Sequence, residues 1–167
     1  MVEGDGDLRQ DILDLLASRT VQLEEIVDLV HFLQKDRQPG LTKEDCRESI
    51  LRVLSKREVQ YALLVGIQLD RLAEKGLVDE PLLTILREDS PLFGIDEVLA
   101  LAITNVYGSI GLTNFGYLDK QKIVVLARLQ HEEQELRGQV HTFLDDLVAA
   151  VAAAAASRLA HRYGESQ

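Results

Sequence analysis

The apolar side chains of this chain recur at the three- and four-residue spacing of amphipathic helices. The pattern predicts one helix over residues 8–16 and a second over residues 21–33, with Thr20 as the cap of the second. Residues 122–129, KIVVLARL, are open to interpretation as a strand, but a loop followed by a short helix fits them better. We therefore predict an all-α protein.

Two further helix starts have the spacing of a capping box, in which a hydroxyl side chain and an acid three residues later satisfy free backbone N–H groups. Thr42 with Asp45 marks the first start, and Ser55 with Glu58 marks the second. We expect the helix after Ser55 to run to about Gly76, because apolar residues continue at helical spacing up to that point.

The stretch LVAAVAAAAA at residues 147–156 has no polar residue on any side of a helix. A helix that is apolar all round is a buried helix, and small alanine side chains let neighbouring helices approach closely. The sequence thus predicts a multihelical bundle with one central buried helix surrounded by the others. Residues that should be inaccessible to solvent are Ala149, Ala150, Ala152 and Ala153.

Composition narrows the class of protein. The 167 residues, 46% of them hydrophobic, suit a single helical domain over residues 1–167. The only cysteine, Cys46, excludes an intrachain disulfide and a zinc-thiolate site. The formal net charge of −10 argues against a nucleic-acid partner and favours a cation. The single cysteine is typical of a reducing, cytoplasmic location. The longest apolar run, residues 147–156, is about half of a membrane-spanning helix, so we expect no transmembrane segment.

Two acidic pairs stand directly before apolar helical runs. Asp96 and Glu97 precede one run, and Asp145 and Asp146 precede the buried run described above. One interpretation is structural, since acids in the first turn are favoured by the helix dipole. The other is a shared cation site, which Asp89 and Asp119 join if the helices pack side by side. Clustered carboxylates with few histidines are typical ligands of a hard cation such as Mg²⁺.

The order of these acids resembles the phosphatidylglycerophosphatase A family. That family shows an aspartate six residues before Asp-Glu, then Asp-x-x-Lys-Pro, then Leu-Asp-Asp before a helix of small residues. The corresponding residues here are Asp89, Asp96, Glu97, Asp119, Lys120, Leu144, Asp145 and Asp146, with Lys120 directly after Asp119. Residues 54–76 and 105–120 further resemble a soluble branch of the family from Gram-positive bacteria, whose all-helical fold has a central helix. The resemblance covers residues 40–163, which leaves residues 1–38 as an acidic N-terminal helical hairpin.

The resemblance implies a phosphate monoester hydrolase that acts on phosphatidylglycerophosphate with Mg²⁺ as cofactor. On this basis, the metal ligands and water-activating groups are assigned to Asp96, Glu97, Asp119, Asp145 and Asp146, with Asp96 and Asp145 as the catalytic acids. Lys120 is the candidate phosphate contact and a catalytic group, and His141 is a further candidate for substrate binding. Two of these residues have structural alternatives, since Asp119 is equally suited to an N-cap and His141 to an ordinary polar position.

Two other functions stay open at this point. A helical protein that uses its acids only for caps and ion pairs would be a non-catalytic interaction protein. An enzyme with the same acids would also suit a soluble phosphate substrate. The expected partners are accordingly a phosphorylated lipid head group or a small phosphate ester, together with a divalent cation. We further expect a homo-oligomer, either free in the cytoplasm or held peripherally at the membrane.

Overall fold

The structure is a computed structural model and describes residues 7–135 and 138–165. These residues form helices joined by short loops and contain no strand, so the predicted all-α class is confirmed. In chain order the helices are α1 (Arg9–Ser18), α2 (Leu23–Gln34), α3 (Lys43–Leu54), α4 (Arg57–Glu74), α5 (Leu82–Arg87), α6 (Ile95–Thr104), the 3₁₀ helix η1 (Asn105–Tyr107), α7 (Gly108–Gln121), α8 (Val125–Glu135) and α9 (Leu144–Glu165).

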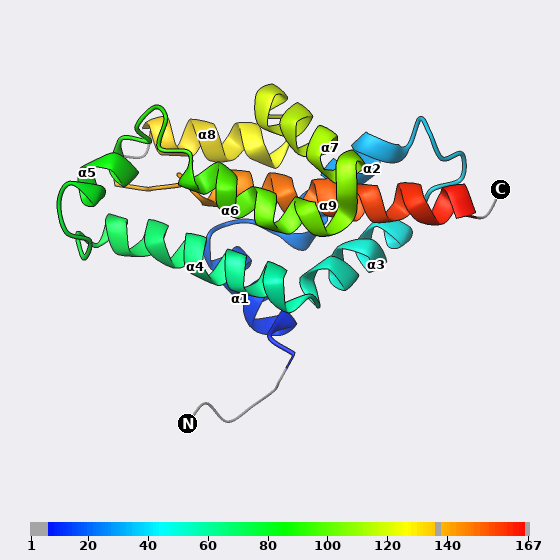
Figure 1. Ribbon diagram of the computed structural model, residues 1–167, viewed down its shortest axis with the longest axis horizontal. Coiled ribbons are helices and arrows are strands. Elements are labelled where there is room, and N and C mark those ends of the chain that lie inside the picture. Colours follow the sequence, from blue (N-terminus) through cyan, green and yellow to red (C-terminus); the bar gives the residue numbers. More distant parts are fainter. Residues whose placement is uncertain (1–6, 136–137, 166–167) are drawn as a thin grey trace.

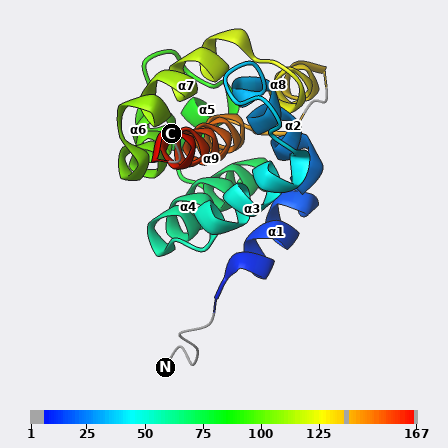
Figure 2. The same cartoon turned by 90° about the vertical axis from the view of Figure 1, so that its right-hand side faces the viewer.

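Helix α9 lies at the centre of the bundle. Figures 1 and 2 show it running along the long axis with α2, α3, α4, α6, α7 and α8 around it, and each of these helices packs against it. Every side chain of residues 147–156 is 0% exposed, including the four alanines predicted to be inaccessible. The central-helix architecture is therefore confirmed, and its cause is the lack of any polar face on α9.

Helices α4 and α9 approach closely at Gly66. A Cβ atom built on Gly66 would lie 2.6 Å from Leu147 Cδ1 and 3.0 Å from Phe143 Cβ, which is closer than side chains normally pack. Glycine costs helix stability relative to alanine, so its presence within α4 has a packing reason. This contact places α4 against the beginning of α9, where the acidic pair Asp145 and Asp146 lies.

The two N-terminal helices pack against different partners. Helix α2 lies against α9 and α3 and buries Ile26, Val27, Leu29 and Val30 completely, whereas α1 packs on α4 and α3. Within the N-terminal hairpin expected over residues 1–38, α2 therefore belongs to the core. Residues 1–6 of that segment lie outside the described residues.

Helix caps match the sequence prediction at one of three starts. Thr42 and Asp45 form the predicted capping box of α3. At α4 the cap position is Lys56, and Ser55 Oγ instead donates to the Arg52 carbonyl of the preceding helix, so the Ser55 prediction is wrong. Ser55 is close enough to α3 to satisfy a free carbonyl at its C-terminal end, which competes with N-capping.

Thr20 does not cap α2. Its backbone lies in the left-handed region, with φ of +63°, and the capping box is formed by Gln22 and Glu25 two residues further on. The predicted loop and short helix at residues 122–129 is confirmed, since α8 begins at Val125.

By length and composition alone, the helical run Ile95–Gln121 is apolar enough to cross a membrane. The structure divides this run into α6, η1 and α7, with Gly108 at φ of +74° between the last two. Each helix is shorter than the roughly 20 residues that a spanning helix needs. About two thirds of its most apolar stretch is only partly buried or exposed, and apolar side chains such as Val98 and Val106 lie on the surface of the bundle.

Candidate functional site

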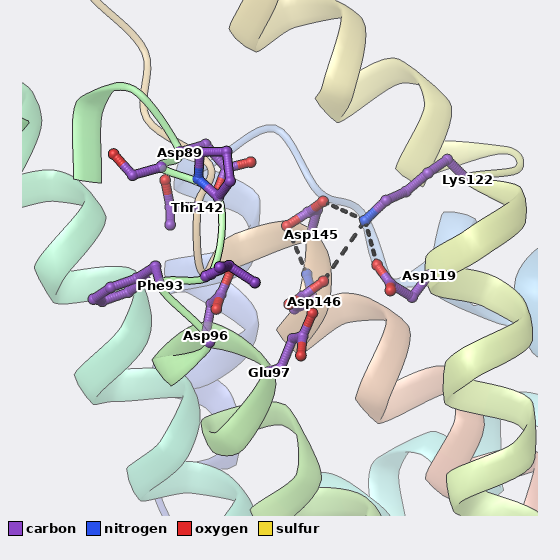
Figure 3. Close-up of a pocket in the computed structure, with 13 residues that line it drawn as sticks. Asp89, Phe93, Asp96, Glu97, Asp119, Lys122, Thr142, Asp145 and Asp146 are labelled. Carbon is purple, nitrogen blue, oxygen red and sulfur yellow. Dashed lines mark hydrogen bonds and ion pairs between the residues drawn. The ribbon is translucent and has the colours of Figure 1, made fainter. Parts of the chain in front are cut away.

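A pocket of about 460 Å³ opens at one end of the bundle, where helix termini distant in sequence meet. Its walls are the α5–α6 loop, the first turn of α6, the last turn of α7 with the following residue, and the beginning of α9. Figure 3 shows the polar side chains converging from these elements. The lining residues are Asp89, Ser90, Pro91, Leu92, Phe93, Gly94, Asp96, Glu97, Asp119, Lys122, Thr142, Asp145 and Asp146.

The pocket concentrates negative charge. Six of its lining residues are carboxylic acids and one, Lys122, is a base. All five predicted metal ligands therefore lie in one place, together with Asp89. Carboxylates at such close quarters repel one another, and the cost grows as water is excluded.

Lys122 is the internal counter-ion of these acids. Its Nζ lies 2.7 Å from Asp145 Oδ2, 2.8 Å from Asp119 Oδ1 and 3.6 Å from Asp146 Oδ1. Asp145 Oδ1 also accepts the backbone N–H of Asp146 at 2.8 Å, which uses a free donor in the first turn of α9. The ammonium thus holds three carboxylates that come from two helices.

Protonation equilibria in the pocket reflect this crowding. Burial, followed by the charge of Asp145, raises the pKa of Asp146 to about 8. Burial also raises the pKa of Asp145, although Lys122 opposes that shift. Burial disfavours the Lys122 ammonium, yet the charge and hydrogen bonds of Asp145 and Asp119 raise its pKa above the ordinary lysine value. With one lysine among six acids, the carboxylates cannot all be ionised without electrostatic repulsion.

Asp96 and Glu97 enter the pocket from the first turn of α6. Gly94 is the N-cap residue of α6, has positive φ and offers no side chain to cap the helix. The backbone N–H groups at this helix end favour negative charge, which suits the two acids of the first turn. Asp96 Oδ1 is buried and has no hydrogen-bond partner. A buried carboxylate oxygen without a donor is unusual in a folded protein and indicates that a proton or a cation belongs beside it.

The start of α9 is held by a residue that the sequence analysis missed. Asp70, on α4, is 0% exposed and accepts the backbone N–H groups of Phe143 and Leu144 at 3.0–3.2 Å. Burial raises the pKa of Asp70 well above its ordinary value, and these N–H donors counteract the shift. A signal was present, because Asp70 continues the buried face that includes Leu63 and Ile67 at helical spacing.

His141 does not line the pocket. It is buried, its Nδ1 lies 3.3 Å from the Arg19 guanidinium, and its Nε2 lies 3.1 Å from Gln139 Oε1. Arg19 also donates to the Val140 carbonyl and pairs with Glu74, so this cluster fixes the segment that leads into α9. Burial and the charge of Arg19 lower the pKa of His141 to about 4, so the ring is neutral near pH 7. In this position His141 supports the site from outside rather than facing a substrate.

Lys122 lies in the pocket in place of Lys120, so the prediction for Lys120 is wrong. Lys120 is exposed and is not among the lining residues, whereas Lys122 lies at the centre of the acids. The sequence contained the signal for this, because Asp119 and Lys122 have the Asp-x-x-Lys spacing of the family motif. Ile123 stands where that motif has proline.

Backbone strain is concentrated beside the pocket. In the described part of the chain, five residues other than glycine have positive φ, and four of them flank the pocket in two loops. These are Asp89 and Leu92 in the α5–α6 loop, and Lys122 and Val124 in the α7–α8 loop. The left-handed conformation costs about 1–2 kcal/mol for such residues, and strain of this kind gathers at functional sites.

The acids are not arranged around a metal ion as they stand. Among the described side chains, no three histidine, cysteine, aspartate or glutamate residues lie close enough to hold one together. Lys122 Nζ occupies the space between Asp119, Asp145 and Asp146. The donor set nevertheless suits a hard cation, because every candidate ligand atom is a carboxylate oxygen and Asp96 Oδ1 has no other partner.

Two solved bacterial proteins have the same fold. A protein of unknown function from Bacillus stearothermophilus has 55% sequence identity and a TM-score of 0.88, over 94% of this chain and 96% of that one. The low temperature requirement C protein from Listeria monocytogenes has 51% identity and a TM-score of 0.90, over 96% of this chain and 99% of that one.

Sequence comparison gives relatives of similar length. The uncharacterized protein YutG of Bacillus subtilis is 53% identical over 147 residues, which is 88% of this chain and 87% of YutG. The uncharacterized protein YpjQ of the same organism is 51% identical over 154 residues, which is 92% of this chain and 85% of YpjQ.

A family model described as phosphatidylglycerophosphatase A matches residues 20–161. The match begins about twenty residues before the start expected from the sequence motifs and so includes α2, in agreement with the place of α2 in the core. From this match and from relatives that share half of its residues, the chain belongs to the phosphatidylglycerophosphatase A family.

Proposed function

We propose that this protein is a Mg²⁺-dependent phosphatase that removes the terminal phosphate of phosphatidylglycerophosphate. Membership of the phosphatidylglycerophosphatase A family supports the reaction and the substrate class. The pocket supports a phosphate monoester as the reacting group, since its volume falls within the usual range for small-ligand sites and it holds a lysine among acids.

The observation that carries the proposal is the imbalance of charge in the pocket. Six carboxylic acids and one lysine repel a phosphate dianion unless a further cation enters with it. Asp96 Oδ1, which is buried without a partner, supports the same conclusion. The acids are therefore suited to a metal and not to direct contact with phosphate.

The residues that would hold Mg²⁺ are Asp96, Glu97, Asp145 and Asp146, with Asp119 beside them. When bound, Mg²⁺ supplies positive charge that offsets the phosphate and polarises a phosphoryl oxygen. Asp146, with its raised pKa, gives up a proton when a cation approaches, so binding should become tighter as pH rises.

Two side chains act on the substrate in this proposal. Lys122 donates N–H groups to the phosphate oxygens, the role that the sequence analysis had given to Lys120. With Oδ1 facing the cation, the other carboxylate oxygen of Asp96 would orient the attacking water and accept its proton. Asp145 positions the Lys122 ammonium through the contact at 2.7 Å.

A phosphatase assay with matched variants tests the proposal. Phosphate release from phosphatidylglycerophosphate is measured with Mg²⁺ and with a chelator, and glycerol phosphate serves as the soluble substrate. We expect activity only with Mg²⁺, and a loss of kcat of about 100-fold or more for Asp96→Asn and Lys122→Gln, the usual effect of removing one stabilising group. The controls Asp79→Asn and Lys120→Gln, which lie outside the pocket lining, should keep activity within about twofold.

The outcome decides between the functions left open by the sequence. Activity on glycerol phosphate alone would assign a soluble substrate. Failure of the wild-type protein to release phosphate from either substrate, with Mg²⁺ present and the fold verified by circular dichroism, would reject the phosphatase proposal. Equal losses in the Lys122 and Lys120 variants would reject the role given to Lys122.

A further inference from the structure

The mouth of the acidic pocket is bordered by exposed apolar side chains. Leu92, which itself lines the pocket, has a relative exposure of 102%, and Ile95, directly after the lining residue Gly94, is 54% exposed. Val124, two residues after the lining residue Lys122, is 49% exposed. We call Leu92, Ile95 and Val124 the apolar rim.

Both loops of the rim have the same construction. Each contains a charged residue that lines the pocket and an apolar residue that is exposed, and both residues have positive φ. The pairs are Asp89 with Leu92, and Lys122 with Val124. A branched side chain in the left-handed conformation is disfavoured, and in the described part of the chain Leu92 and Val124 are the only apolar residues that adopt it.

We propose that the apolar rim inserts into the surface of a lipid bilayer and brings the pocket to the phosphorylated head group of its substrate. This inference rests on the proposed function and adds the way in which the site meets its substrate. A phospholipid has a charged head group and apolar acyl chains. The charged groups inside the pocket suit the head group, and the apolar side chains outside it suit the acyl region of the bilayer.

A second copy of the chain fits this surface less well. Stable protein interfaces use about 20–30 residues on each side, whereas the rim contributes three side chains. A protein seated on the rim would also cover the pocket mouth that the substrate must enter. The net charge of −10 opposes electrostatic attraction to an anionic membrane, so contact through apolar insertion is the mode left to this protein.

The test compares a rim variant with a matched variant elsewhere. The rim variant is Ile95→Ser with Val124→Thr, which removes apolar surface at two exposed rim positions that do not line the pocket. The control is Leu77→Ser with Val65→Thr, since Leu77 is 67% and Val65 is 53% exposed and neither lines the pocket. Binding is measured by flotation with phosphatidylcholine vesicles, first without substrate and then with phosphatidylglycerophosphate in the bilayer.

We expect the wild type and the control to float with the vesicles at low and high salt, and the rim variant to bind roughly 10-fold or more weakly. Hydrolysis of vesicle phosphatidylglycerophosphate should fall by a similar factor in the rim variant, while hydrolysis of glycerol phosphate stays within about twofold. Wild-type protein that does not bind vesicles, or a rim variant that binds as well as the control, would overturn the inference. A change of oligomeric state in the rim variant, seen by analytical ultracentrifugation, would assign the rim to a second copy instead.

Failure of this inference and failure of the proposed function are distinguishable. Vesicle binding without substrate does not depend on phosphatase activity, so it tests the rim even in an inactive protein. Conversely, if the wild type and the rim variant hydrolyse the lipid equally well, the proposed function is upheld and the proposed role of the apolar rim is rejected.

Discussion

Single residues at the start of α9 show how the fold tolerates acids next to an apolar helix. Asp145 and Asp146 lie beside free N–H groups and near the Lys122 ammonium, while Asp70 takes up the N–H groups of Phe143 and Leu144 from another helix. Buried carboxylates are costly unless such partners are present. The residues that make the acids possible therefore lie far from them in sequence.

His141 provides a prediction about stability and pH. Its folded pKa is about 4, and its unfolded pKa is about 6.5, so the unfolded state binds the proton first as pH falls. The neutral His141 ring makes its full contribution to the free energy of unfolding above pH 6.5. That free energy should decrease by up to about 1.4 kcal/mol per pH unit between pH 6.5 and 4. Urea unfolding of wild type and His141→Gln across this range measures the difference.

The variant should show a shallower decrease of stability with falling pH than the wild type. The matched control is His131→Gln, because His131 is an exposed histidine on α8. A slope unchanged by His141→Gln would contradict the assignment of a neutral, buried ring that accepts from Arg19.

At the level of elements, the contact between α4 and α9 sets the position of the site. Gly66 lets α4 approach the beginning of α9, and Asp70, one turn later on α4, caps that same beginning. One helix thus controls both how close α9 comes and where its first turn lies. Because Asp145 and Asp146 belong to that turn, packing in the core and geometry in the pocket are coupled.

Gly66→Ala tests this coupling. The added methyl meets the flexible end of Leu147, which can move, and also Phe143 Cβ at 3.0 Å, which is fixed to the backbone just before α9. We expect a loss of about 1–3 kcal/mol in the free energy of unfolding, as is usual for overpacking. Thermal or urea unfolding gives the value.

The matched control is Gly116→Ala on α7, where nothing lies within 4 Å of an added Cβ. This substitution should stabilise the protein by about 0.4–1 kcal/mol, because alanine has the higher helix propensity and restricts the unfolded chain. Equal effects of the two substitutions would show that α4 and α9 do not pack tightly at Gly66.

The whole molecule is built on one core, and α1 belongs to it although the family match begins after α1. Ile12 and Leu16 of α1 are 0% and 2% exposed and join the same apolar cluster as the side chains of α9. A chain of this size with one core should unfold as a single unit. The single domain and the homo-oligomer expected from the sequence stay predictions.

The substitution Ile12→Ala tests how much α1 contributes to the stability of the single core. We expect a loss of about 2–5 kcal/mol, the usual cost of a cavity at a buried isoleucine, with one transition that coincides by circular dichroism and tyrosine fluorescence. Gln10→Ala, at an exposed position of the same helix, should change stability by less than about 0.5 kcal/mol. Separate transitions, or a negligible effect of Ile12→Ala, would place α1 outside the core.

The sequence by itself determined the features that depend on local periodicity. The all-α class, the burial of residues 147–156 and the acids in the first turns of α6 and α9 all follow from residues within one or two turns of each other. A helix without a polar face has to be buried whatever surrounds it, so no knowledge of its neighbours was needed.

Only the tertiary structure decided which charged groups meet. It brought Lys122 rather than Lys120 to Asp145, gave Asp70 to the start of α9, placed His141 beside Arg19, and used Ser55 to satisfy the end of α3. Helical spacing limits which side a residue faces, but it does not say which helix ends lie together. Those contacts join positions as far apart as 19 and 141 along the chain, and they are set by the packing of whole helices around α9.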